Sequence, residues 1–366
     1  MIKQDLFLIE PLSIGEEHIN INSMLLSSIL KQKDNYRNIH FIGEKKHCSI
    51  LRKKFKNKIT FIDALKRRNS RFFNFLFALQ LVCLSVLKPS KIIFLSSNKN
   101  TIRLNAFLYS KNKITSIIHS YFSEFLQDIK LSENSLFKKS LDRTVFFVFR
   151  EDILKHVKKI NQNININFIE HPIEKKFEFQ DKKQIKNIAF LGRPSKEKGF
   201  DKYLDFIKKI RSDIRWNGIK FYHIGPMEEV QKNDITKGYL DPLSNLCENF
   251  KAEDNQFINN DDFDVMLKKI DCVFYCNENC DYQYIASGTI FDAISYGKKI
   301  IGLKDSFVKD IESRHRSIGI FAENIEDLAK TLVHYKFNFE PEYIENKVND
   351  IFSSEYQSSI KRFLDK

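Results

Sequence analysis

The feature that most constrains the fold of this chain is a unit that recurs along it: a short apolar run of strand length, then a longer segment with helix-like spacing of apolar residues. In the first half, the apolar runs are rich in β-branched and aromatic residues and lie at 5–10, 38–44, 58–63, 91–97, 114–120 and 144–150. Strands that alternate with helices form parallel sheets that helices cover on both faces. The pattern therefore predicts an α/β fold.

The same alternation restarts in the second half, with apolar runs at 186–192, 219–225, 271–276, 298–303 and 318–323. Before it lies EKKFEFQDKKQIK, a charged stretch without helix or strand period, which is typical of a linker. A chain of 366 residues also exceeds the size at which one core usually stops growing. We therefore predict Rossmann-like domains at 1–178 and 179–340, and a helical segment at 341–366 that either packs back on the first domain or extends as a charged helix.

Composition narrows the compartment and the partners. The chain has 42% hydrophobic and 13% aromatic residues, as folded proteins do, and no apolar run long enough to predict a membrane-spanning helix. Its first residues lack the layout of a signal peptide, so we expect a cytoplasmic protein. The formal net charge of +13 favours an anionic partner, which could be nucleic acid, an acidic membrane surface or a phosphorylated substrate.

The cysteines do not predict disulfides or a metal site. Six are scattered over the chain, which fits reduced thiols. Cys272, Cys276 and Cys280 are four positions apart, but the first two share one face of an apolar strand and no second pair follows. Core packing is therefore expected rather than zinc binding.

The second half contains a loop suited to hold phosphate. In GRPSKEKGF (192–200), Arg193 and Lys198 follow a strand end, where doubly wound sheets bind their ligands. Arg193 offers a planar fork for phosphate oxygens, Lys198 a mobile charge, and the next helix adds unpaired backbone amides. We predict a diphosphate clamp; the alternative is a helix cap with solvated charges.

A second segment, ASGTIFDAISYG (286–297), fits the same ligand. Ser287, Gly288 and Thr289 form a turn of small residues before a helix-period run, and such a helix start binds anions through its free amides. Asp292, one turn further on, can accept hydrogen bonds from ribose or sugar hydroxyls. An ordinary capped helix start is the alternative.

These two segments, together with FYHIGP (221–226) and DDFDVMLKKIDCVFYC (261–276), resemble in order and spacing the C-terminal domain of group 1, family 4-like glycosyltransferases with the GT-B fold. The resemblance implies two Rossmann-like, doubly wound domains whose parallel sheets face a central cleft. It implies transfer of a sugar from a nucleotide-diphosphate sugar to a saccharide or lipid-linked saccharide, in bacterial surface polysaccharide biosynthesis, without metal or other cofactor. The donor-binding residues that it implies are Gly15, Arg193, Lys198, Gly225, Ser287, Gly288, Thr289 and Asp292.

One departure from the family concerns the stereochemical outcome. Retaining members carry two glutamates where this chain has Tyr284 and Asp292. Because Tyr284 cannot supply the anion expected near the donor sugar, retaining and inverting mechanisms both stay open.

In the first half, the candidate catalytic residues are Glu17 and His119. Glu17 follows Gly15 in PLSIGEEHIN and is a candidate general base for an acceptor hydroxyl, or it simply complements a helix N-terminus. His119 ends the fifth apolar run, where the family often has a histidine that faces the reaction centre, although a structural histidine is the alternative. His171 and His223 are weaker candidates, for the inter-domain edge and the nucleotide loop.

The segment 66–88 joins a basic cluster, Lys66, Arg67, Arg68 and Arg71, to a Phe-rich apolar stretch. It is predicted either to lie on the anionic inner membrane or to be a core helix with a basic start.

Two other functions share some of these features. A GT-B-fold sugar-nucleotide epimerase would use the same nucleotide grip, and the positive charge would suit a non-enzymatic nucleic-acid-binding protein. Because the chain lacks a zinc pattern, a recognition-helix motif and an RNA-binding aromatic signature, nucleic acid is not the expected partner. No G-x-G-x-x-G follows the first strand of either half, which disfavours an NAD-dependent dehydrogenase.

Overall fold

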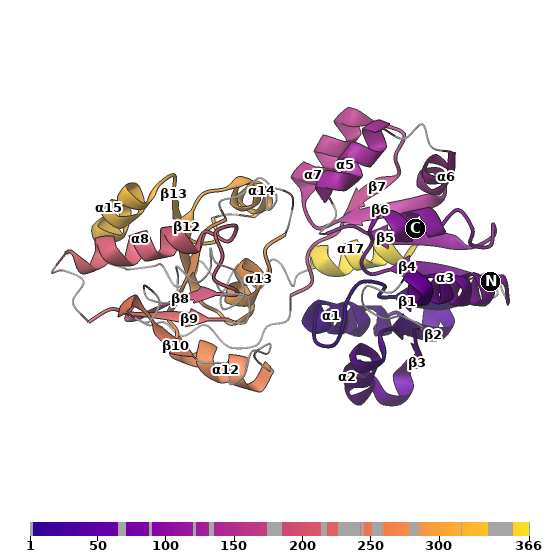
Figure 1. The fold of residues 1–366 in the computed structure, drawn as a ribbon, viewed down its shortest axis with the longest axis horizontal. Helices are drawn as coiled ribbons and strands as arrows, with labels where there is room; N and C mark the ends of the chain where they lie inside the picture. Colours follow the sequence, from indigo (N-terminus) through magenta and orange to yellow (C-terminus); the bar gives the residue numbers. More distant parts are fainter. Residues whose placement is uncertain are drawn as a thin grey trace. The chain divides into compact units, whose positions relative to one another are not determined.

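The computed structural model describes residues 3–64, 71–87, 90–119, 122–131, 135–173, 185–213, 218–225, 242, 245–250, 258, 260–277, 284, 286–315, 317–335 and 354–365. The chain divides into two units, Met1–Pro172 with Ser354–Lys366, and Ile173–Ser353. Each unit is an α/β domain with its own parallel sheet (Figure 1). Most of the expected linker, 174–184, lies outside the described residues.

The sheet of the first domain has seven strands in the order β3-β2-β1-β4-β5-β6-β7, and every neighbouring pair is parallel. Six of the strands are the apolar runs identified in the sequence, and β7 is an additional short one. The strands are β1 (Gln4–Ile9), β2 (Tyr36–Gly43), β3 (Thr60–Asp63), β4 (Ser90–Phe94), β5 (Lys113–Ile117), β6 (Thr144–Val148) and β7 (Ile166–Phe168).

Helices connect these strands because parallel strands need a crossover between them. The helices of this domain are α1 (Ile19–Leu30), α2 (Lys45–Phe55), α3 (Arg71–Leu87), α4 (Lys99–Leu104), α5 (Phe122–Leu131), α6 (Ser135–Arg143) and α7 (Glu151–Ile160), with the single 3-10 turns η1 (Lys33–Asn35) and η2 (Lys56–Lys58). On one face of the sheet, Phe77 and Leu81 of α3 pack against Phe7 of β1 and Ile92 of β4.

The C-terminal helix α17 (Ser354–Asp365) packs on this first domain, although it is the last element of the chain (Figure 1). The hydroxyls of Ser28 and Tyr356 are 3.1 Å apart, and the rings of Phe147 and Phe363 meet edge to face at 4.8 Å. The ammonium of Lys91 donates a hydrogen bond to the carbonyl of Leu364. Burial lowers the pKa of Lys91 to about 8, so this contact places a charged group inside the domain.

The second domain has a six-stranded parallel sheet in the order β10-β9-β8-β11-β12-β13. Its strands are β8 (Asn187–Leu191), β9 (Lys220–Ile224), β10 (Glu248–Phe250), β11 (Cys272–Tyr275), β12 (Lys299–Leu303) and β13 (Ile320–Ala322). Its helices are α8 (Phe200–Arg211), α12 (Asn260–Lys269), α13 (Gly288–Ser295), α14 (Ser306–Arg314) and α15 (Ile325–Tyr335). The sequence pattern identified all of these strands except β10.

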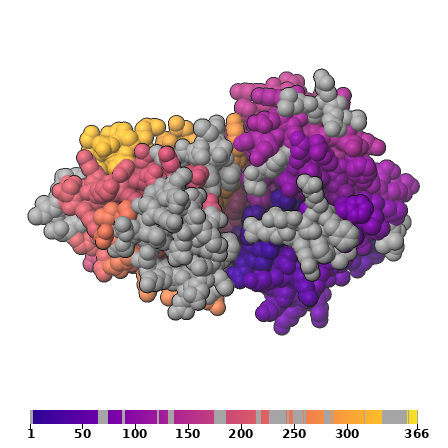
Figure 2. Space-filling model, in the orientation of Figure 1, coloured from indigo at the N-terminus to yellow at the C-terminus, as the bar shows by residue number. Residues whose placement is uncertain are grey.

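Both faces of the second sheet are covered, as the apolar runs predict for a doubly wound domain. On one face α8 and α15 lie side by side (Figure 2) and bury Phe206 and Leu328 against the strands. On the other face, α12, α13 and α14 bury a second apolar cluster. Cys272 and Cys276 are buried in the first cluster, which confirms core packing for these two thiols, whereas Cys280 lies outside the described residues.

The strand order reverses direction once in each sheet, between β1 and β4 and between β8 and β11. In open α/β sheets, ligands bind beyond the carboxyl ends of the strands at such a switch point, because the two flanking loops diverge there. The loops that follow β1 and β8 are therefore the places where each domain can hold a ligand.

Candidate functional site

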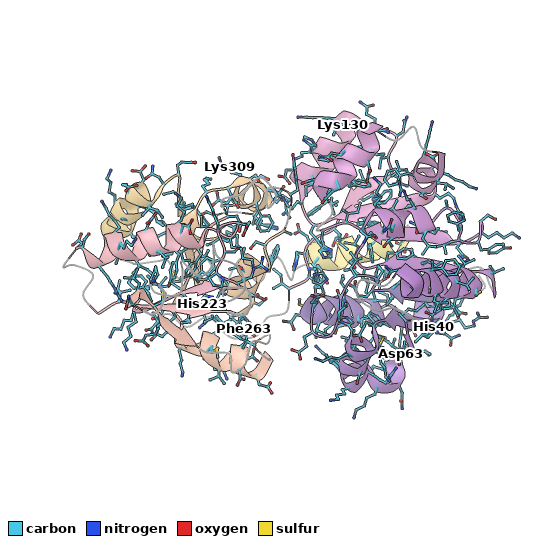
Figure 3. All side chains as sticks on the ribbon, viewed as in Figure 1. His40, Asp63, Lys130, His223, Phe263 and Lys309 are labelled. Atoms are coloured by element: carbon cyan, nitrogen blue, oxygen red, sulfur yellow. The ribbon has the colours of Figure 1, made fainter. Side chains whose placement is uncertain are left out.

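The loop after β8 is fixed by backbone contacts with the end of β9. The amide of Gly192 donates to the carbonyl of Ile224 over 2.8 Å, and the buried His223 of β9 (Figure 3) donates from Nε2 to the Gly192 carbonyl over 2.8 Å. A Cβ on Gly225 would lie 2.1 Å from that carbonyl oxygen, so only glycine fits there. Gly192 and Gly199 have φ of 98° and 68°, which favours glycine at both ends of the loop.

This loop brings Lys198 and Arg193 together with Asp292 of α13. Lys198 is half-buried, and its ammonium approaches the Gly192 backbone closely. Burial lowers the pKa of Lys198, the charge of Arg193 lowers it further, and Asp292 opposes both. The loop also carries Glu197, whose pKa is lowered chiefly by a hydrogen bond to its own backbone amide and to a smaller extent by the charges of Arg193 and Lys196. An ammonium that is partly removed from water beside another cation gains stability from an anionic ligand.

The first turn of α13 presents backbone amides without a side-chain cap. Ser287 is the N-cap residue, has extended backbone, and makes no side-chain cap hydrogen bond. Gly288 is exposed, and no heavy atom lies within 4 Å of the position that its Cβ would occupy. The start of this helix is therefore open to a ligand that accepts hydrogen bonds.

The sequence analysis selected seven residues in the second half. Two of them, Arg193 and Lys198, belong to the loop after β8, and Gly225 and Asp292 lie next to this loop. The other three, Ser287, Gly288 and Thr289, begin the helix that carries Asp292. Tyr284 is half-buried shortly before this helix. Contact of these residues with a donor stays a prediction.

The loop after β1 is held by hydrogen bonds to both backbone groups of Gly15. Its amide donates to Oε2 of Glu44 over 3.1 Å, and its carbonyl accepts from Nδ1 of His47 over 2.9 Å. Glu44 also caps α2, because its carboxylate accepts from the amides of Lys46 and His47 at 2.9 and 3.0 Å. Gly15 has φ of 59°, a conformation that glycine adopts readily.

A buried carboxylate, Glu10, lies at the base of the same loop and is 1% exposed. Burial raises its pKa, but the charge of His18 and the hydrogen bonds that it accepts outweigh burial and hold the pKa below its ordinary value. Its donors are the amides of Leu12 (3.0 Å) and Ser13 (3.1 Å), the Ser96 hydroxyl, and Nδ2 of Asn22 (3.0 Å). The sequence analysis missed Glu10; the available signal was an acidic residue directly after an apolar strand.

Asn22 connects Glu10 to His47 and thereby fixes the tautomer of the imidazole. Its amide nitrogen is 3.1 Å from Nε2 of His47, which therefore accepts, while Nδ1 carries the proton that is donated to Gly15. Burial lowers the pKa of His47, in agreement with a neutral ring. The sequence analysis also missed these two residues, which come from two different helices.

His119 and His18 meet beside this loop. Their ring centroids are 4.7 Å apart in an edge-to-face arrangement, and Nδ1 of His18 is 2.8 Å from the Ser13 hydroxyl. His18 has φ of 56°, which is uncommon for a residue with a side chain and marks a strained position. Burial lowers the pKa of His119 to about 4, and the charge of His18 adds to this. Neither ring nitrogen of His119 has a hydrogen-bond partner among the described residues.

Glu17 is half-buried, and its Oε2 accepts a hydrogen bond from the amide of Ile14 over 3.1 Å. This contact ties the carboxylate to its own loop, ahead of α1, whose first turn contains no acidic residue. The general-base role stays a prediction.

The described part of the segment 66–88 is the helix α3, which packs in the core through one face, and contact with a membrane stays a prediction. Phe77 and Leu81 are buried in the core, whereas Phe75 and Leu79 are 65% and 49% exposed. Lys66, Arg67 and Arg68, and the side chain of Arg71, lie outside the described residues. Among the described helices, none has both the length and the apolar character that crossing a membrane requires.

Comparison with solved structures identifies the fold. A scan of protein-family models and a search of curated proteins found no match. Among solved structures, a glycosyltransferase from Rickettsia africae ESF-5 aligns with a TM-score of 0.67 at 12% identity, over 100% of this chain and 98% of that chain. The lipopolysaccharide outer core galactosyltransferase WaaB aligns with a TM-score of 0.65 at 12% identity, over 99% of both chains.

A third solved structure, S. aureus TarM in complex with fondaparinux, alpha-GlcNAc-glycerol and UDP, aligns with a TM-score of 0.64 at 11% identity, over 99% of both chains. At these identities the likeness establishes the fold. The chain has the GT-B fold of glycosyltransferases, and the predicted fold class is confirmed.

Proposed function

We propose that the chain is a glycosyltransferase that moves a sugar from a nucleotide-diphosphate sugar to a saccharide or lipid-linked saccharide acceptor. The observation that carries the proposal is the cluster after β8, where Lys198 lies beside Arg193, with Asp292 near by on the open-ended helix α13. The GT-B fold supports the proposal, and so does the UDP in the TarM complex. We place the reaction in bacterial surface polysaccharide biosynthesis, on the cytoplasmic side of the membrane.

In the proposed mechanism, Arg193, Lys198 and the amides around Gly288 neutralise the diphosphate as its bond to the sugar breaks. Charge stabilisation at the leaving group, where charge develops, is usually the largest single contribution to such a reaction. No metal or other cofactor is part of this proposal. Asp292 accepts hydrogen bonds from hydroxyls of the ribose or the sugar.

We assign the first domain to the acceptor. His119, whose burial keeps its imidazole neutral near pH 7, hydrogen-bonds a sugar hydroxyl, and Glu17 accepts the proton of the attacking hydroxyl if the enzyme inverts. The exposed apolar face of α3 provides peripheral contact with the anionic inner membrane.

The experiment that tests this function is a thermal-shift panel of UDP-, GDP-, TDP- and CMP-sugars, followed by product analysis with the donor that stabilises the chain most. A glycosyltransferase releases nucleotide diphosphate in step with glycosylated acceptor. The alternative epimerase would change the sugar nucleotide without any acceptor. A nucleic-acid-binding protein would instead bind random duplex in a salt-dependent way, with no stabilisation by any donor of the panel.

A further inference from the structure

The first domain contains a cavity between α3 and α4. Its volume is about 720 Å³, inside the range of about 300–1,000 Å³ that small-molecule sites occupy. Part of its wall is the loop after β1, which contributes Leu12, Ile14 and Glu17. The cavity therefore adjoins the loop that we assign to the acceptor.

The helical walls of the cavity are mainly apolar, although Asn74 of α3 and Asn100 and Thr101 of α4 also line it. Phe77 and Val82 of α3 and Leu104 of α4 line it, and Phe75, Leu79 and Phe107 are both lining residues and exposed, by 65%, 49% and 58%. Large apolar side chains gathered at one surface site mark a place where an apolar partner binds. Saccharide hydroxyls would gain little from the apolar part of these walls, because they would leave water there without hydrogen-bond partners.

One cation, Arg103 of α4, also lines the cavity and is half-buried. In the part of the chain that the structure describes, no carboxylate pairs with its guanidinium, whereas Lys99 of the same helix pairs with Asp128. A guanidinium binds phosphate in a bidentate manner. Arg103 thus offers an anion site next to apolar walls.

We propose that this cavity binds the hydrocarbon chain of an amphiphilic acceptor, with an anionic phosphate of its head group against Arg103. The inference rests on the proposed glycosyltransferase function, because it specifies the lipid part of the acceptor. A chain in the cavity has its head group near Glu17 and Ile14, so the hydroxyl that receives the sugar lies on the same side of the domain as the loop after β1.

The test is calorimetric binding of hexyl, octyl and decyl phosphate to the full chain, at concentrations below those at which they form micelles. Each added methylene should tighten binding by about fourfold until the cavity is filled. Decanol, which lacks the anion, should bind more weakly than decyl phosphate. Inorganic phosphate should show no measurable binding at the same concentrations, which separates a lipid phosphate from a free phosphate site.

Two variants locate the site. Ala78→Trp fills the cavity and should weaken the binding of decyl phosphate by at least tenfold. Val86→Trp, on an exposed part of the same helix outside the cavity, should leave this affinity unchanged. Arg103→Gln should weaken the binding of decyl phosphate about tenfold and leave the affinity for decanol unchanged. Unfolding midpoints check that each variant is folded, and Arg103→Gln with the chain-length series carries the test if Ala78→Trp does not fold.

Equal binding by wild type and folded Ala78→Trp, or equal affinities for all three alkyl phosphates, would overturn the proposal. The assay needs neither donor nor turnover. A chain that binds decyl phosphate in this cavity but releases no nucleotide diphosphate keeps the lipid site and loses the proposed function. A chain that glycosylates soluble saccharides but ignores alkyl phosphates keeps the function and loses the lipid site.

Discussion

The loops after β1 and after β8 occupy equivalent places at the switch points of their sheets, but they are held by opposite chemistry. The first is held by carboxylates, since Glu10 and Glu44 accept hydrogen bonds from amides of the loop. Asn22 connects Glu10 to His47 in the same network. The second is held by backbone and by His223, and three of its charged side chains, Arg193, Lys196 and Lys198, are cations.

The difference shows how one topology serves two ligands. In the first loop two carboxylates, Glu10 and Glu44, fix the backbone, and the neutral imidazole of His119 and the carboxylate of Glu17 lie beside it, which suits hydroxyls. In the second loop the backbone is fixed without charge, and the loop carries Lys198 and Arg193 side by side, which suits an anionic ligand. We therefore expect acceptor chemistry at the first loop and donor phosphate at the second.

The largest effect is expected from variants of the loop after β8. Arg193→Ala and Lys198→Met should each lower kcat/KM by about ten- to a thousandfold, because each removes charge from the leaving group. Methionine keeps the packed stem of the half-buried Lys198, so the fold should be retained. The measurement is steady-state release of nucleotide diphosphate.

Lys196→Ala is the matched control, since Lys196 is an exposed cation on the same loop. Its kcat/KM should stay within about twofold of wild type, because exposed charges contribute little. If all three variants turned over like wild type, the loop would not be a diphosphate site.

A smaller effect tests the first side. Glu10→Gln replaces one carboxylate oxygen by an NH2 group, which donates instead of accepting. At least one of the buried groups that donate to Glu10 in the wild type therefore loses its partner. Such a loss costs about 1–3 kcal/mol, and urea unfolding should show it as a lower free energy of unfolding. Glu16→Gln, on the same loop but exposed, should change it by less than about 0.5 kcal/mol. If Glu10→Gln left the free energy of unfolding unchanged, the carboxylate would not be what holds the loop.

The sequence predicted the strands and the second loop better than the first. Each apolar run became a strand because its period and length are local properties, whereas β7 and β10, of three residues each, are too short to show a period. Arg193 and Lys198 were predictable because a few adjacent positions build that loop. The Glu10 network was not, because Ser96 is 86 positions away and His47 lies on another helix, and only the strand order brings them together.

The smallest expected effect is a pH dependence of stability. It distinguishes the neutral imidazole of His119, which lies beside the first loop, from the Glu10 carboxylate. Burial lowers the pKa of His119 to about 4 and that of His171 to about 3, both below the ordinary value of 6.5. Between pH 6.5 and these values the unfolded chain binds more protons, so the free energy of unfolding should fall as the pH is lowered from 7 to 5. Glu10 does not oppose this trend, because its lowered pKa makes its stabilisation complete above about pH 4.5.

His119→Phe keeps the ring volume and removes one proton site, so urea unfolding of this variant at pH 7, 6 and 5 should give a shallower slope than wild type. One pKa unit corresponds to about 1.4 kcal/mol, which makes the difference measurable by pH 5. His171→Phe should remove a second share of the slope, because burial lowers the pKa of His171 as well. An unchanged slope in His119→Phe would show that this imidazole is protonated near pH 6 in the folded chain, and the contrast between a neutral imidazole beside the first loop and the cations of the second loop would no longer hold.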